Sequence, residues 1–105
     1  MVEQVSPFGL AALLPLSPPS NLIASGVTTP DGTGNYVYSG EYHDYALYHN
    51  EAKNLWLFFG EEIGTWIVSD ELVNLHHGWT RVNASPVGAY NPFGGYTGIL
   101  TMAEA

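Results

Sequence analysis

The sequence has no cysteine and almost no positive charge, and both absences narrow what the chain can do. Without cysteine, no disulfide can stabilise a small core. Lys53 and Arg81 are the only basic residues against ten carboxylates, which gives a formal charge of −8. Nucleic acids and anionic membrane surfaces are bound through several Lys or Arg side chains. We therefore expect neither nucleic acid nor a membrane as a partner.

Charge of either sign is scarce, and aromatic, glycine and proline residues are abundant instead. Charged residues make up 11% of the chain, whereas aromatic residues make up 13%, with 12 glycines and 7 prolines among 105 residues. This composition is typical of a turn-rich β-protein and of a surface that binds through flat, uncharged contacts. The length fits one domain with one modest core.

The first quarter of the chain predicts an arm rather than a membrane segment. Its apolar run, GLAALLPL, is shorter than the roughly 20 residues needed to span a bilayer. A signal peptide is disfavoured because Glu3 stands where positive charge is expected. Pro15, Pro18 and Pro19 fix φ and lack amide donors, which favours an extended segment. The exposed apolar side chains would need cover, and these are Phe8, Leu10, Leu13, Leu14 and Leu16.

Two interpretations of this arm remain open on the sequence alone. It packs on its own domain, with one helical turn before Pro15, or it lies on a neighbouring subunit. We favour the neighbouring subunit, because a body of roughly 80 residues has little spare surface to cover the arm. We accordingly divide the chain into an N-terminal arm, residues 1–22, and a β-domain, residues 23–105.

From about Asn21 the pattern changes to short strand-like runs separated by turn residues. Candidate strands recur every eight to twelve residues, which predicts an all-β fold. We expect a small antiparallel sandwich or barrel-like module with the extended N-terminal arm. An edge strand is expected after residue 86, and a final strand at about 97–102. A break is expected at Ser39-Gly40-Glu41, and residues 69–78 are either a short helix or a loop.

The segment LWLFFGEEIGTWIVS predicts the centre of the core. Both LWLFF and TWIV are apolar on both faces, so each should form a central strand that is covered on both sides. GEEIG should be the hairpin connector between them. We assign Trp56 and Trp66 to the core.

No group of residues predicts catalysis or metal binding. The candidate metal cluster is His43, His49, His76 and His77 with Glu41 and Asp44. Zinc needs three or four converging ligands, and adjacent residues such as His43 and Asp44 face opposite sides of a strand. Ser39, Ser69 and Ser85 lack a nucleophile elbow, and Glu61 and Glu62 read as a solvated bend. We expect no catalytic residue, no cofactor and no metal, and therefore no enzyme.

The order of short motifs resembles a known module. It runs G-N-Y-x-Y-x-G, E-Y-H-D-Y-x-L-Y, N-L-W-L-F, W-I-V-S, G-W, P-x-G-x-Y-x-P and Y-T-G, over about residues 26–102. It is similar to a small aromatic- and glycine-rich β-module of tailed-bacteriophage virion structural proteins, which also recurs in some extracellular proteins. The resemblance does not extend to the N-terminal arm. It implies a structural or binding role.

These observations lead to a first hypothesis of a noncatalytic virion structural protein. It would be a capsid decoration (cement) protein or an accessory of the tail, collar or fibre, on the outer surface of the virion. Its partners would be the major capsid or tail protein and copies of itself. Contacts are expected from the arm and from a loop at residues 86–96, and they comprise Phe8, Leu10, Leu13, Leu14, Leu16, Tyr90, Phe93 and Tyr96.

Two other hypotheses remain. The first is a carbohydrate- or receptor-binding β-module that uses exposed Tyr and Trp side chains, since aromatic residues of this kind can stack on sugars. The second is a small enzyme or metal-dependent protein, which no motif supports.

Overall fold

The computed structural model describes residues 20–61, 63–72, 76–83 and 85–105. These residues form β-strands and connections and contain no helix, which confirms the all-β prediction. The strands are β1 (Leu22–Ser25), β2 (Gly34–Tyr42), β3 (Tyr45–Asn50), β4 (Leu55–Gly60), β5 (Thr65–Ser69), β6 (Gly78–Arg81), β7 (Gly88–Phe93) and β8 (Leu100–Glu104).

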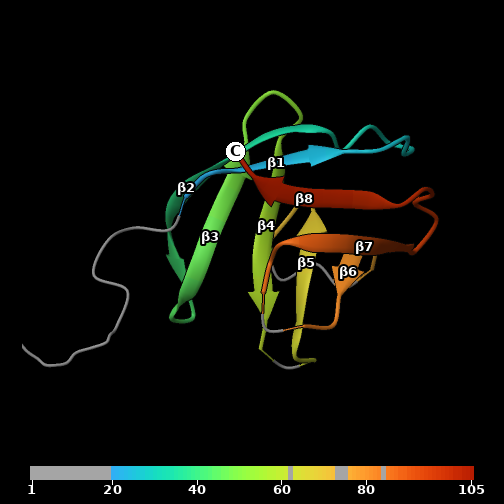
Figure 1. The fold of residues 1–105 in the computed structure, drawn as a ribbon. Coiled ribbons are helices and arrows are strands. Elements are labelled where there is room, and N and C mark those ends of the chain that lie inside the picture. Colours follow the sequence, from blue (N-terminus) through green and yellow to red (C-terminus); the bar gives the residue numbers. More distant parts are fainter. Residues whose placement is uncertain (1–19, 62, 73–75, 84) are drawn as a thin grey trace, which may run out of the picture.

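The eight strands close into an antiparallel barrel in sequence order (Figure 1). Each strand pairs with the next, and β1 pairs with β8 through Leu22–Glu104 and Ser25–Thr101. Closure removes free sheet edges. The edge strand expected after residue 86 is therefore wrong, because β7 pairs with both β6 and β8. Among the described residues, the strand pairings lie within residues 22–104.

Two strands form corners of the barrel because they change partner along their length. The first residues of β2 pair with β1, and those from Val37 onward pair with β3. Likewise, Gly88–Tyr90 of β7 pair with β8, and Asn91–Phe93 pair with β6. Figure 1 shows the result, with β1, β8 and β7 crossing the direction of β3, β4 and β5. The barrel is thus two roughly orthogonal layers joined at their corners.

The β2–β3 hairpin corrects one prediction. The chain does not break at Ser39-Gly40-Glu41, because β2 continues through these residues with a register shift between Tyr38 and Glu41. Gly40 has a φ of 108°, so glycine absorbs the irregularity as a bulge. The reversal comes instead at His43 and Asp44, whose φ values of 52° and 71° suit a tight hairpin turn.

The barrel interior is filled by side chains. Tyr36, Trp79 and Tyr90 are fully buried, together with Leu57 and Leu100. The polar atom of each of these three aromatic side chains donates a hydrogen bond to a main-chain carbonyl. The Tyr36 hydroxyl donates to the Gly32 carbonyl at 2.7 Å, and the Tyr90 hydroxyl donates to the Pro86 carbonyl at 2.6 Å. Trp79 Nε1 donates to the Gly98 carbonyl at 3.2 Å. These bonds allow aromatic residues with polar atoms to serve as core.

A second apolar cluster lies on the outer side of β3, β4 and β5. Leu47, Phe58 and Ile67 are buried there, and Leu72 and Phe93 pack against them. β4 and β5 are therefore covered on both sides, as predicted, and GEEIG connects them. Trp66 lies in the barrel core as expected. Trp56 is half-buried on the outer cluster, where its ring stacks on His49 at 3.9 Å.

The connection from β5 to β6 contains no helix among its described residues, and residues 73–75 lie outside the described part of the chain. The buried Ser69 hydroxyl donates to the His77 carbonyl at 2.9 Å, and His77 Nε2 lies 3.0 Å from Asp70 Oδ1. Serine, histidine and aspartate thus meet here, but the serine is buried and bonds main chain. The contacts brace the connection and expose no nucleophile.

The buried tyrosines predict alkaline unfolding. Burial raises the pKa of Tyr36 and of Tyr90 well above the usual value near 10. The stability gained by keeping them protonated is present below about pH 10 and is lost as pH rises above it. We expect a cooperative loss of near-UV circular dichroism above pH 10, together with a jump in tyrosinate absorbance. Smooth tyrosine titration with unchanged dichroism would contradict this packing.

Candidate binding site at the barrel mouth

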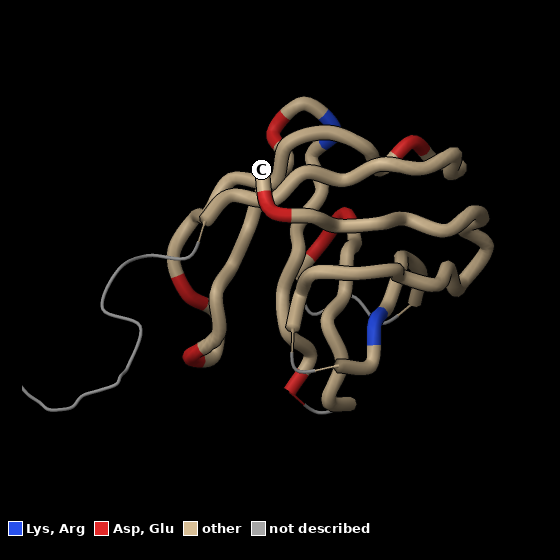
Figure 2. Tube along the Cα trace, viewed as in Figure 1, with Lys and Arg blue, Asp and Glu red and all other residues tan. Residues whose placement is uncertain are grey.

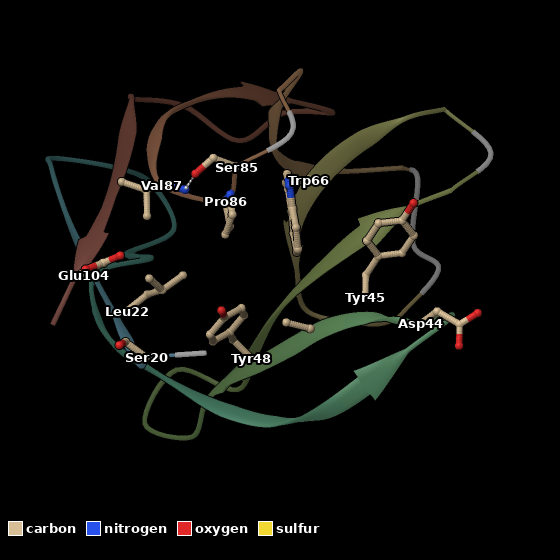
Figure 3. A pocket seen from close by; sticks show the side chains of 11 residues that line it. Ser20, Leu22, Asp44, Tyr45, Tyr48, Trp66, Ser85, Pro86, Val87 and Glu104 are labelled. Atoms are coloured by element: carbon tan, nitrogen blue, oxygen red, sulfur yellow. Dashed lines mark hydrogen bonds between the residues drawn. The ribbon is translucent and has the colours of Figure 1, made fainter. Parts of the chain in front are cut away.

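One opening of the barrel, here called the mouth, is surrounded by three connections between strands. The first and last residues of the barrel domain also lie there. The turn at His43–Asp44, the β4–β5 connection and the β6–β7 connection lie there, with Ser20 and Glu104. A pocket of about 380 Å³ opens at this end (Figure 3). Because the deeper interior is filled by side chains, a ligand that enters at the mouth could reach only the outer part of the barrel.

The floor and walls of the mouth are apolar. Leu22, Tyr48 and Trp66 are buried and form its inner part, and Pro86 and Val87 line one side. The surface that the partly exposed Pro86 and Val87 present to the pocket would pack well against another apolar group.

Tyr45 forms the opposite wall, and its ring is held by neighbouring aromatic rings. It lies 4.3 Å from Phe59 between ring centroids, and Phe59 lies 5.3 Å from Trp66. Tyr45 remains 39% exposed. The aromatic wall is therefore fixed in position yet open to a partner.

The rim is polar and acidic. Asp44 and Glu104 lie on opposite sides of the mouth, with Ser20 beside Glu104 (Figure 3). No Lys or Arg is among the described residues that line the pocket. Burial raises the pKa of Tyr48, with smaller contributions from Tyr38 and Glu104, so its hydroxyl stays protonated at neutral pH. The mouth therefore combines apolar walls with negative charge at the edge.

The β6–β7 side of the mouth is held by local hydrogen bonds. The Val87 amide donates to Ser85 Oγ at 3.1 Å, and the Ser85 amide donates to Asn83 Oδ1 at 3.0 Å. Arg81 Nε donates to the Ser85 carbonyl at 3.0 Å. These bonds fix Pro86 and Val87 at the pocket, so this wall is preformed.

The structure describes three of the predicted contact residues, Tyr90, Phe93 and Tyr96. Phe8, Leu10, Leu13, Leu14 and Leu16 lie outside the described residues. Tyr90 is fully buried in the barrel, so it is a core residue and offers no surface to a partner. Phe93 packs on the outer cluster. Tyr96 lies against Trp79 and His77, with ring centroids 4.8 and 4.9 Å away.

The histidines are dispersed rather than clustered. His43 packs on Tyr42, His49 on Trp56, and His77 pairs with Asp70. Within the described ranges, no three His, Asp or Glu side chains are placed to share a metal ion.

Comparison with known proteins adds no relative. No family model, curated protein or solved structure matches this chain. In the part of the chain that the structure describes, no helix has the length and apolar character to cross a membrane. Function is therefore argued from the residues of the mouth and its surroundings.

Sequence reasoning missed the mouth because its residues are scattered from Ser20 to Glu104. Only barrel closure brings them together. One signal was present: HDY at 43–45 places two turn-forming residues before an aromatic residue, as a hairpin tip at a barrel end would.

Proposed function

We propose that this chain is a noncatalytic structural protein of a tailed-bacteriophage virion, a capsid decoration (cement) protein or an accessory of the tail, collar or fibre. It lies on the outer surface of the particle. Its partners are the major capsid or tail protein and further copies of itself. The motif order over residues 26–102 supports the class of protein, and the arrangement of the mouth supports the mode of attachment.

The observation that carries the proposal is where the arm meets the barrel. Ser20, the first described residue, lines the mouth, so the apolar arm joins the domain at the rim of an apolar, partly open pocket. Asn21 is anchored beside it, since its carbonyl accepts from the Ala105 amide at 3.0 Å and its Oδ1 from the Tyr38 amide at 3.0 Å. Arm and mouth thus form one attachment end.

A second surface suits docking on a protein lattice. The outward side chains of β1, β2 and β8 include Ile23, Val37 and Thr101, and Ile23 and Val37 are 44% and 48% exposed. Figure 2 shows β1 and β8 free of charge, except for Glu104 at the rim. Flat uncharged surfaces lose little water-mediated interaction when they are buried in an interface.

Removal of the arm tests the proposal. Tagged full-length chain and a chain lacking residues 1–19 are produced during phage growth, and particles are purified by gradient sedimentation. We expect the full chain to sediment with particles at a fixed ratio to the major protein. The armless chain should fold and be recovered at least about tenfold less, because the lost leucine burial is worth that or more in affinity. Absence of both chains from particles would refute the virion role.

Carbohydrate binding is a second candidate, and one observation favours it. Tyr45 presents an open aromatic wall, and Asp44 and Glu104 place carboxylate acceptors on opposite sides of the mouth. Sugars are commonly bound by stacking on aromatic rings, with hydroxyls donated to carboxylates. Nuclear magnetic resonance titration of the full chain with oligosaccharides would distinguish carbohydrate binding from the virion role. Carbohydrate binding requires chemical-shift changes centred on Tyr45 and Trp66.

A further inference from the structure

We infer that the mouth of one copy receives the apolar arm of a second copy, with leucines of the segment Phe8–Leu16 entering between Tyr45 and Val87. This inference rests on the proposed function, because it specifies how copies of the chain join on a virion. It names one occupant for the pocket: the N-terminal segment of another molecule of the same chain.

The chemistry of the two partners matches. The mouth offers Leu22, Pro86 and Val87 beside the aromatic walls, and none of the described side chains that line it is positively charged. The arm carries one carboxylate, Glu3, which stands apart from the run GLAALLPL. Apolar side chains therefore meet apolar walls, while the acidic rim stays in contact with water. Burial of each leucine is worth about tenfold in affinity or more.

The junction between arm and barrel favours exchange between copies. Pro18 and Pro19 directly precede Ser20, and each restricts φ and favours extended backbone. The sequence therefore predicts an extended arm, and an extended arm can reach the mouth of a neighbouring copy.

Such a contact is heterologous, because the arm of one copy binds the mouth of the next and the two surfaces differ. Head-to-tail contacts of this kind build rings when the rotation closes, and open arrays when it does not. A many-copy coat or collar component requires this property. Each copy in the assembly would then give one arm and receive one.

Two complementary variants test the inference. One is the armless chain, residues 20–105, which retains all strand pairings of the described residues and all the described residues that line the mouth. The other is full-length Val87→Glu, which retains the arm but places a charge on the mouth wall. Analytical ultracentrifugation should show the parent chain as an oligomer and each variant alone as a monomer. An equal mixture should form a dimer with one chain of each kind, which cannot grow further.

Val82→Glu is the matched control for charge. Val82 lies in the same β6–β7 connection but is 79% exposed and does not line the pocket. This variant should assemble as the parent does, whereas Val87→Glu should weaken assembly at least about tenfold. Near-UV circular dichroism verifies folding. If Val87→Glu fails to fold, Tyr45→Ser replaces it, because that side chain is partly exposed and its loss opens no buried core position.

Several results would overturn the inference. A parent chain that stays monomeric at every concentration would mean that no arm is exchanged. Assembly of Val87→Glu at parental strength would mean that the mouth is not the receptor. If the mixture of the armless chain and Val87→Glu stayed monomeric, and oligosaccharides shifted the magnetic resonance signals of Tyr45, the pocket would be a sugar site instead. Full chain that still sediments with phage particles in any of these cases would leave the virion role standing, so the two failures are distinguishable.

Discussion

Gly94→Ala is expected to destabilise the barrel by about 3 kcal/mol or more, because a methyl group has no room there. Gly94 has a φ of 68°, and an added Cβ would overlap the His76 carbonyl oxygen and lie 2.6 Å from His77 Cα. Both obstacles are main chain, so no side-chain rotation relieves the overlap. The turn after β7 would have to move away from the β5–β6 connection. Urea unfolding followed by tryptophan fluorescence measures the loss.

The adjacent glycine provides the control. Gly95 also has a positive φ, 96°, but a Cβ there meets nothing within 4 Å. Gly95→Ala should therefore cost only the conformational strain of about 1 kcal/mol. Equal destabilisation by the two substitutions would mean that the close approach of His76 to Gly94 does not exist in solution.

Trp79→Ala is expected to remove about 3–5 kcal/mol of stability, a large part of the roughly 5–15 kcal/mol typical of a small domain. Trp79 is fully buried, its Nε1 donates to the Gly98 carbonyl at 3.2 Å, and its ring packs against Tyr96. The substitution leaves a cavity in the barrel, and the Gly98 carbonyl in the β7–β8 connection loses this donor. Scanning calorimetry should show a melting temperature lower by about 15 °C or more, or no transition at all.

Trp56→Ala is the control that shows whether the destabilisation comes from the buried position of Trp79 or from the loss of any tryptophan. Trp56 is half-buried on the outer cluster, where His49 stacks on it. Its loss should cost clearly less than that of Trp79, because water can reach the vacated site. If Trp56→Ala proves the more damaging, the division into a barrel core and an outer cluster is wrong.

Local pattern was enough to predict the centre of the fold. LWLFF and TWIV have no polar face, so their two-sided burial followed directly, and GEEIG marked the turn between them. The break at Ser39-Gly40-Glu41 was wrong because glycine serves a turn and a bulge equally well by composition. Trp79 was missed because its strand, GWTR, is short and its burial depends on Tyr96 and Gly98, far along the chain.

The mouth was not predictable from local pattern. It exists only because β1 pairs with β8, which brings Ser20 and Glu104 beside the β2–β3 turn and the β6–β7 connection. Tyr90 is a second position whose environment local pattern did not predict. Its glycine- and proline-rich surroundings suggested an exposed loop, yet β7 turns a corner there and carries the tyrosine inward, where its hydroxyl bonds the Pro86 carbonyl.

The absence of cysteine allows the exchange of arms to be measured directly. A full-length chain carrying both Leu14→Cys and Val87→Cys is assembled and then oxidised, and its mass is determined without reductant. Arms seated in neighbouring mouths predict a ladder of covalently joined chains, and the Leu14→Cys, Val82→Cys chain should give little of it. A closed single chain with an internal disulfide, or two free thiols in the assembled protein, would contradict the account.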